Sequence, residues 1–136
     1  RQIDVAIQLF EVMGIKKKDK EKRMDWTLRG FRQFDAPVSL VLTYDKYLEP
    51  AAISHFALGA LSYGIVLAAW DRGIGCVING QGIMQSDVVR EHAKIPENEN
   101  IMICIAMGYP DPDFAANDVR STRIANDSFV NYLGFD

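Results

Sequence analysis

The sequence predicts a single domain that contains both helices and strands, and three observations support this. The length of 136 residues suits one domain. Segments with apolar residues at helical spacing alternate with short apolar segments rich in β-branched residues. One stretch of 20 residues, 51–70, contains no Asp, Glu, Lys or Arg, which predicts a helix with no solvent-facing side.

The N-terminal third predicts two helices. The first covers residues 2–13, and Gly14 suits its C-terminal stop. The second covers about Lys18 to Phe31. Met24, Leu28 and Phe31 are expected to face inward from this second helix. The apolar face of the first helix consists of Ile3, Ala6, Ile7, Phe10 and Met13.

The remaining elements follow from short patterns. Residues 37–43 predict a strand bounded by Pro37 and Asp45, and residues 101–107 predict a strand buried on both faces. A short helix is predicted over 86–93 with Ser86 as N-cap. Residues 109–125, rich in Pro, Asp and Asn, predict an extended surface loop. The apolar end, Phe129 to Phe135, predicts contact with another surface.

The uncharged helix, about Ala51 to Asp71 with Pro50 placed at its first position, is long enough to span a membrane. We reject that interpretation because Ser, His and Tyr dilute its apolarity and no cluster of basic residues flanks it. The better interpretation is a helix buried on all sides. Because a domain this small can hardly bury a whole helix alone, we expect a second subunit to cover it.

The segment Gly73 to Gly82 holds four glycines in ten residues and permits two interpretations. It lacks the Gly-Lys-Ser/Thr ending of a phosphate loop, and it follows a helix rather than a strand, which excludes a dinucleotide fingerprint. It could be a helix stop that leads tightly into a strand, where glycine supplies positive φ. Alternatively, its glycines let exposed backbone N–H groups contact a flat ligand.

Charge and composition exclude several functions. The net charge of −3 and the pI near 5.3 argue against nucleic acid or anionic lipid as a partner. Cys76 and Cys104 predict buried free thiols in a reducing compartment, the cytoplasm, rather than a disulfide. His55 and His92 fit neither a nucleophile–base pair nor a zinc-ligand spacing, so no metal site is expected. No carboxylate pair stands out either.

Arg120 and Arg123 lie close together in the late loop, where guanidinium groups could hold phosphate oxygens or could simply be solvated. The sequence therefore predicts no catalytic side chain. A protein of this kind can still be an enzyme if a cofactor carries the chemistry.

Several segments resemble the FMN-dependent nitroreductase family, in the family's own order. Leu-Ala-Ala-Trp-Asp-Arg-Gly-Ile-Gly-Cys at 67–76 is similar to its "LAA…GLG-(S/T)-C" stretch, and Phe-Asp-Ala-Pro-Val at 34–38 to its "F-x-AP-V". Residues 89–98 are similar to "vR…lgIPed" and residues 105–111 to "iaLGYPd". Arg123 and Val130 fall where the family has "R-x-pl-eevv". The resemblance runs from about residue 10 to the end.

The resemblance implies an α+β fold with a central sheet flanked by helices, in an intertwined homodimer whose long buried helix forms much of the interface. It implies a flavin-dependent NAD(P)H oxidoreductase that reduces nitroaromatic, quinone or similar acceptors in a ping-pong cycle, with FMN between the subunits. The alternative is a non-catalytic dimeric module of the same fold that has lost FMN.

Carried over position by position, the resemblance implies a cofactor site. Ile78, Asn79 and Gly80 match the segment whose backbone faces the flavin ring, and Gln81 is adjacent. Arg123 matches the late basic residue at the FMN phosphate, with Arg120 as an assistant. Where many relatives have a second basic residue, this chain has Ser121. The family's N-terminal Arg-Arg-Ser-x-Arg segment has no counterpart, so we expect the domain over 1–136 to be N-terminally incomplete.

Overall fold

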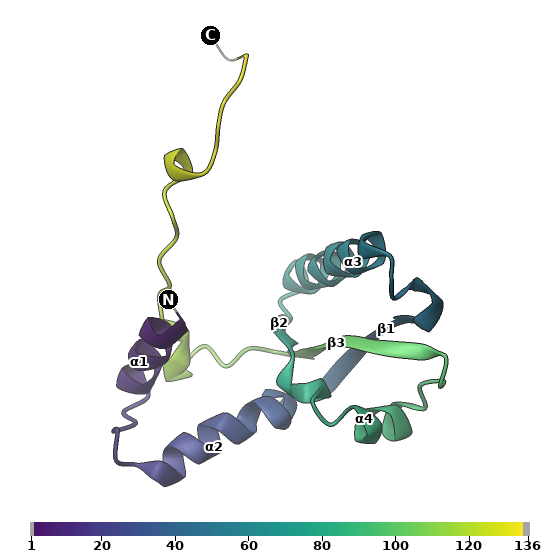
Figure 1. Cartoon of the computed structure of the whole chain (residues 1–136). Coiled ribbons are helices and arrows are strands. Elements are labelled where there is room, and N and C mark those ends of the chain that lie inside the picture. Colours follow the sequence, from purple (N-terminus) through teal and green to yellow (C-terminus); the bar gives the residue numbers. More distant parts are fainter. Residues whose placement is uncertain (1, 135–136) are drawn as a thin grey trace. The chain divides into compact units, whose positions relative to one another are not determined.

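The chain forms two compact units in the computed structural model, which describes residues 2–134 (Figure 1). One unit comprises Lys20–Asp111, and the other combines Arg1–Asp19 with Pro112–Asp136. The two ends of the chain therefore belong to the same unit. The prediction that residues 1–136 form a single domain stays a prediction, because two contact-dense units can still belong to one domain.

The unit Lys20–Asp111 is built on a three-stranded antiparallel sheet in the order β1-β3-β2. Its central strand is buried on both faces, as the sequence predicts, with Cys104 and Ile105 fully buried and Ala106 nearly so. Figure 1 shows α3 and α4 on opposite sides of this sheet. The elements are α2 (Lys20–Phe31), β1 (Val38–Asp45), α3 (Ala52–Trp70), β2 (Gly75–Asn79), α4 (Ser86–Ala93) and β3 (Glu99–Gly108).

The glycine-rich segment contains a strand rather than one continuous turn. Gly73, at φ +71°, ends α3, and the N–H of Ile74 donates to the carbonyl of Ala69 at 3.0 Å. Strand β2 begins two residues after Gly73 and pairs with β3. The backbone therefore makes a helix stop that leads into a strand, and glycine supplies the left-handed conformation at the stop. Contact of the exposed backbone with a flat ligand stays a prediction.

Helix α3 is largely exposed in the single chain. Only 11% of its apolar window is buried, and among its residues Ser62 and Ala69 alone are fully buried. The prediction of burial on all sides is therefore wrong for the chain by itself, because the three-stranded sheet covers only one side of the helix. Its length and its mean hydropathy of 1.6 also satisfy the requirements of a membrane span, as core helices of soluble proteins do.

Some boundaries and burials differ from the sequence-based expectations. In α2 the side chains of Met24, Leu28 and Phe31 are exposed, so the prediction that they face inward is wrong for the chain alone. Helix α3 begins after an Ala51 N-cap, two residues later than the position predicted from Pro50. Gln85 precedes α4, which makes Ser86 its first helical residue rather than its N-cap.

The second unit contains helix α1 (Gln2–Val12), which Gly14 follows at φ +63°, as predicted. Helix α1 lies beside a short 3₁₀ turn, Ala115–Asp118, and the rest of the late segment is extended, apart from a second short turn (Figure 1). Phe129, Tyr132 and Leu133 are largely exposed, so the predicted contact of this end with another surface stays a prediction. Phe135, the last residue of that predicted contact, lies outside the described residues.

Candidate functional site

The end of strand β2 brings four of the predicted site residues together. At the end of this strand Ile78 is 49% exposed, whereas Asn79 is 4% exposed. Gly80 follows as an exposed residue, and Gln81 begins a 3₁₀ turn that ends at Ile83. Because β2 pairs only with β3 in the described sheet, its other edge carries no strand.

The side chain of Asn79 is fully engaged inside the protein. Its Nδ2 donates to the carbonyl oxygen of Gly30 at 2.7 Å and to Oε1 of Gln33 at 3.0 Å. Its Oδ1 accepts a hydrogen bond from the backbone N–H of Gln81 at 3.1 Å. Any ligand at this position would therefore meet the backbone around Asn79 and not its amide group.

A left-handed turn between α2 and β1 supplies the partner of Asn79. Gln33, Phe34 and Asp35 have φ values of +57°, +56° and +58°, a conformation that costs about 1–2 kcal/mol for each residue that has a Cβ. The carboxylate of Asp35 accepts from Nε of Arg32 at 3.1 Å, which ties the turn to the end of α2. This ion pair lowers the pKa of Asp35. Sequence reasoning missed the turn, because Gln and Phe do not favour positive φ, and Asp, although enriched there, does not by itself predict three such residues in a row.

Cys104, on the central strand, completes a cluster with Asn79 and Gln33. Its Sγ lies 2.8 Å from the carbonyl oxygen of Asn79, to which it donates, and it accepts from Nε2 of Gln33 at 3.2 Å. Burial raises the pKa of this thiol, which therefore stays protonated and able to donate. Both cysteines are free, as predicted, but Cys76 is partly exposed, so the prediction that it is buried is wrong for the single chain.

Two glycines make the cluster sterically possible. A Cβ on Gly30 would lie 1.8 Å from Oε1 of Gln81, and a Cβ on Gly82 would lie 1.9 Å from Nε2 of Gln33 and 2.7 Å from Sγ of Cys104. By contrast, a Cβ on Gly80 would meet no atom within 4 Å. The backbone is thus closely packed on its inner side and open at Gly80.

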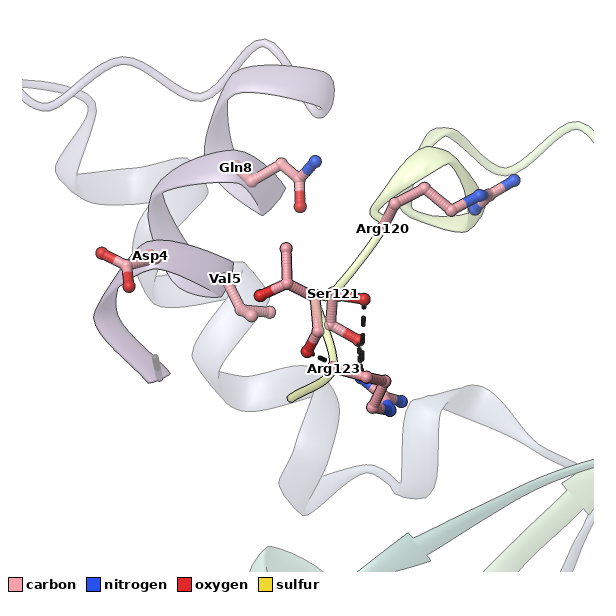
Figure 2. Close-up of a pocket in the computed structure, with 7 residues that line it drawn as sticks. Asp4, Val5, Gln8, Arg120, Ser121 and Arg123 are labelled. Carbon is pink, nitrogen blue, oxygen red and sulfur yellow. Dashed lines mark hydrogen bonds between the residues drawn. The ribbon is translucent and has the colours of Figure 1, made fainter. Parts of the chain in front are cut away.

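Arg120 and Arg123 lie in the other unit, along a cavity of about 800 Å³ between α1 and the late segment (Figure 2). The guanidinium of Arg123 donates to Oγ of Ser121 at 2.6 Å, whereas that of Arg120 bonds to the backbone carbonyls of Asn117 and Val119. Figure 2 shows the side chain of Arg120 pointing away from α1 and that of Gln8 pointing toward the late segment.

The six predicted residues therefore form two groups. Ile78, Asn79, Gly80 and Gln81 are contiguous in one unit, and the two arginines line the cavity of the other. Within residues 2–134, no three His, Cys, Asp or Glu side chains gather as metal ligands do. What the first group offers is backbone and one apolar side chain, and what the second offers is positive charge.

Comparison with known proteins relates this geometry to a family. Residues 4–109 match the model of the nitroreductase family. The chain belongs to the nitroreductase family. The residues of the β2 end and the cluster beneath it lie within the matched range, whereas Arg120 and Arg123 lie beyond it.

Two curated bacterial relatives share sequence along most of the chain. The chain is 30% identical to the chloronitrobenzene nitroreductase of Comamonas testosteroni over 126 residues, which cover 93% of this chain and 55% of the relative. It is 29% identical to the nitrobenzene nitroreductase of Ectopseudomonas oleovorans over the same shares. The chain thus spans about half the length of the curated relatives it matches.

Solved structures show the same α+β fold. The FMN and NADPH-dependent nitroreductase NfnB from Sphigopyxis sp. strain HMH superposes with a TM-score of 0.87 at 21% identity, over 98% of this chain and 59% of that one. The FMN-dependent nitroreductase NfnB from Mycobacterium smegmatis, in complex with NADPH, gives 0.83 at 21% identity, over 97% of this chain and 58% of that one. The nitroreductase fold predicted from the sequence is confirmed.

Proposed function

We propose that the full-length protein is an FMN-dependent NAD(P)H oxidoreductase that reduces nitroaromatic compounds. Quinones or similar acceptors are further candidates. One observation carries this proposal: the chain leaves the backbone at Gly80 open while the side chain of Asn79 is turned inward. Membership of the nitroreductase family, together with relatives named for nitroaromatic substrates, supports it.

The residues present fit a flat ring such as the isoalloxazine of FMN. Ile78 offers a half-exposed apolar side chain, and Gly80 has space where any other residue would place a Cβ. A ring can approach such a backbone closely and accept hydrogen bonds from its N–H groups. Since Asn79 uses its side-chain amide internally, the contact would be made by main chain, which no side-chain titration can disturb.

When bound, FMN would supply the redox chemistry, which is the transfer of a hydride from NAD(P)H and of electrons to the acceptor in the two halves of a ping-pong cycle. The residues of the chain would bind and orient the ring. Among the predicted site residues, none acts as a general acid or base. The specificity for NADH or NADPH would reside in the remaining surface of the site.

We assign the FMN phosphate to Arg123, with Arg120 in an assisting role. Arg123 is exposed and donates only within its own loop, to Ser121 and to the carbonyl of Thr122, contacts that a phosphate can replace. Guanidinium groups match phosphate oxygens in charge and geometry. Arg120, bonded to the carbonyls of Asn117 and Val119, would have to change its rotamer to assist.

A second copy of the chain is the proposed cover of α3. Its exposed face carries large apolar side chains, among them Phe56, Tyr63 and Trp70. Exposed apolar surface of this extent is typical of obligate interfaces. A homodimer is therefore part of the proposed function, and the two free cysteines favour the cytoplasm as its location.

The test is flavin binding by the purified full-length protein. We expect a yellow protein whose flavin absorption NAD(P)H bleaches and a nitroaromatic compound restores. Arg123→Ala should weaken FMN binding about 10- to 100-fold, since a charge-assisted contact is lost, and Arg23→Ala, a matched loss of charge on α2, should leave it unchanged. A colourless dimer that neither binds FMN nor oxidises NAD(P)H would instead identify a non-catalytic module of the same fold.

A further inference from the structure

The left-handed turn before β1 has a higher conformational energy than an ordinary connection between a helix and a strand, and it places one side chain in a specific position. Three consecutive residues, Gln33–Asp35, have positive φ although none is glycine or asparagine. Conformations of this kind persist only where surrounding contacts hold them, and they cluster at functional sites. The contact that distinguishes this turn is the side chain of Gln33.

The amide of Gln33 is enclosed on three sides. Its Oε1 accepts from Nδ2 of Asn79 at 3.0 Å, its Nε2 donates to Sγ of Cys104 at 3.2 Å, and Gly82 leaves the space it occupies. Both ends of the amide are therefore bonded to residues at the end of β2 or beneath it. A shorter side chain, or a larger residue at 82, would break this arrangement.

The hydrogen bonds continue from Gln33 into the exposed backbone. Asn79 receives its orientation from Gln33 and from the carbonyl of Gly30, and its Oδ1 in turn holds the N–H of Gln81. The thiol of Cys104 holds the carbonyl of Asn79. The main chain on both sides of Gly80 is thus held by the side chains of Asn79 and Cys104, which are buried, and of Gln33, which is partly buried.

We propose that Gln33 is a positioning residue, which acts through Asn79 and Cys104 to fix the direction in which the backbone at Asn79 and Gly80 faces a bound flavin ring. This rests on the proposed function. Prearranged N–H groups stabilise developing negative charge more strongly than mobile ones, because they need not reorganise. Reduced flavin carries more electron density than oxidised flavin, so Gln33 should favour binding of the reduced form.

The experiment compares variants of the full-length protein by their dissociation constants for oxidised FMN and by the reduction potential of bound FMN. Together these two measurements give the dissociation constant for the reduced form. Gln33→Met keeps the volume and removes both polar contacts. We expect it to weaken the binding of reduced FMN about tenfold more than the binding of oxidised FMN, which is the size of one lost hydrogen bond.

Leu42→Ala is the matched control, because Leu42 is buried in β1 and its apolar side chain makes no hydrogen bond to Gln33, Asn79 or Cys104. It should lower the melting temperature and leave the ratio of the two dissociation constants unchanged. If Gln33→Met does not fold, Cys104→Ala, which removes the thiol bonded to both Gln33 and Asn79, should change the ratio in the same direction.

The outcomes separate the two proposals. The positioning role is overturned if the ratio of the two dissociation constants is unchanged in the Gln33 or Cys104 variant, or if it changes equally in Leu42→Ala. The proposed function is still upheld in that case if the unaltered protein binds FMN. Failure of the unaltered protein to bind FMN overturns both.

Discussion

Replacing Asn79 by alanine should destabilise the unit Lys20–Asp111 by about 3 kcal/mol, far more than its single side chain suggests. The side chain is 4% exposed and makes three hydrogen bonds, to the carbonyl of Gly30, to Gln33 and from the N–H of Gln81. Alanine leaves these three partners without the bond. An unsatisfied buried group costs about 1–3 kcal/mol, and partial access of water to Gln81 limits the sum.

Urea unfolding followed by circular dichroism measures this loss. Asn79→Ala should lower the urea midpoint with an unchanged slope, because the surface exposed on unfolding stays the same. Asn79→Asp provides the comparison: its carboxylate can still accept from the N–H of Gln81, but it would face the oxygens of Gly30 and Gln33. Burial and those oxygens disfavour the charged form, so stability of this variant should fall as pH rises above the ordinary aspartate range.

The result that would refute the reasoning is a change below about 0.5 kcal/mol for Asn79→Ala, the scale of an ordinary surface substitution. It would mean that water replaces all three bonds and that the cluster does not hold the end of β2. A lower slope together with a lower midpoint would point to a different cause, an altered denatured state or a loss of two-state unfolding.

Two further predictions concern the same cluster. Gly82→Ala should lower the free energy of unfolding by about 2 kcal/mol, because its Cβ would lie 1.9 Å from Nε2 of Gln33. Gly80→Ala, whose Cβ would meet open space, should change that free energy by less than about 1 kcal/mol. Equal urea midpoints for the two variants would contradict this. Arg32 holds the pKa of Asp35 below its usual range, so the stabilisation from this pair is present above about pH 4 and is lost as pH falls through the lowered pKa. Asp35→Asn should therefore flatten the acid side of the stability profile, and an unaltered profile would show that the pair does not contribute.

The strands and helices that the sequence predicted well are those whose pattern depends on the element alone. The continuous apolarity of 101–107 identified a strand covered on both faces, and the structure places it at the centre of the sheet. The uncharged run at 51–70 identified α3 within a residue or two at each end. In both cases the residues themselves carry the information, since no partner is needed to recognise a helix or a buried strand.

Burial was predicted less well, because an apolar face does not say which surface covers it. Met24, Leu28 and Phe31 share a helical face and are exposed in the single chain. Most of α3 is exposed as well. The periodicity of apolar residues indicates that a helical face is covered in the assembled protein. The covering surface can belong to a second copy or to another part of the protein.

The candidate site shows the same division at the level of single residues. Resemblance to a family located Asn79 and Gly80 from local sequence, and these residues do lie together at the end of β2. Gln33 and Cys104 were not recognised, although both bond to Asn79, because they lie 46 and 25 residues away from it. No local sequence pattern predicts a hydrogen bond between residues so far apart in the chain. A left-handed turn made of Gln, Phe and Asp has no sequence signature either.

This difference has a functional consequence. If the backbone of residues 79–81 contacts the ring, then substitutions at the exposed positions should be tolerated better than substitutions beneath them, because main-chain contacts survive a change of side chain. The residues that decide the geometry of the site are then the buried Asn79 and Cys104 and the partly buried Gln33, which a ligand does not need to touch. In such a site, substitutions of exposed residues can change which acceptor is reduced, while the residues beneath the backbone keep the redox properties of the bound cofactor constant.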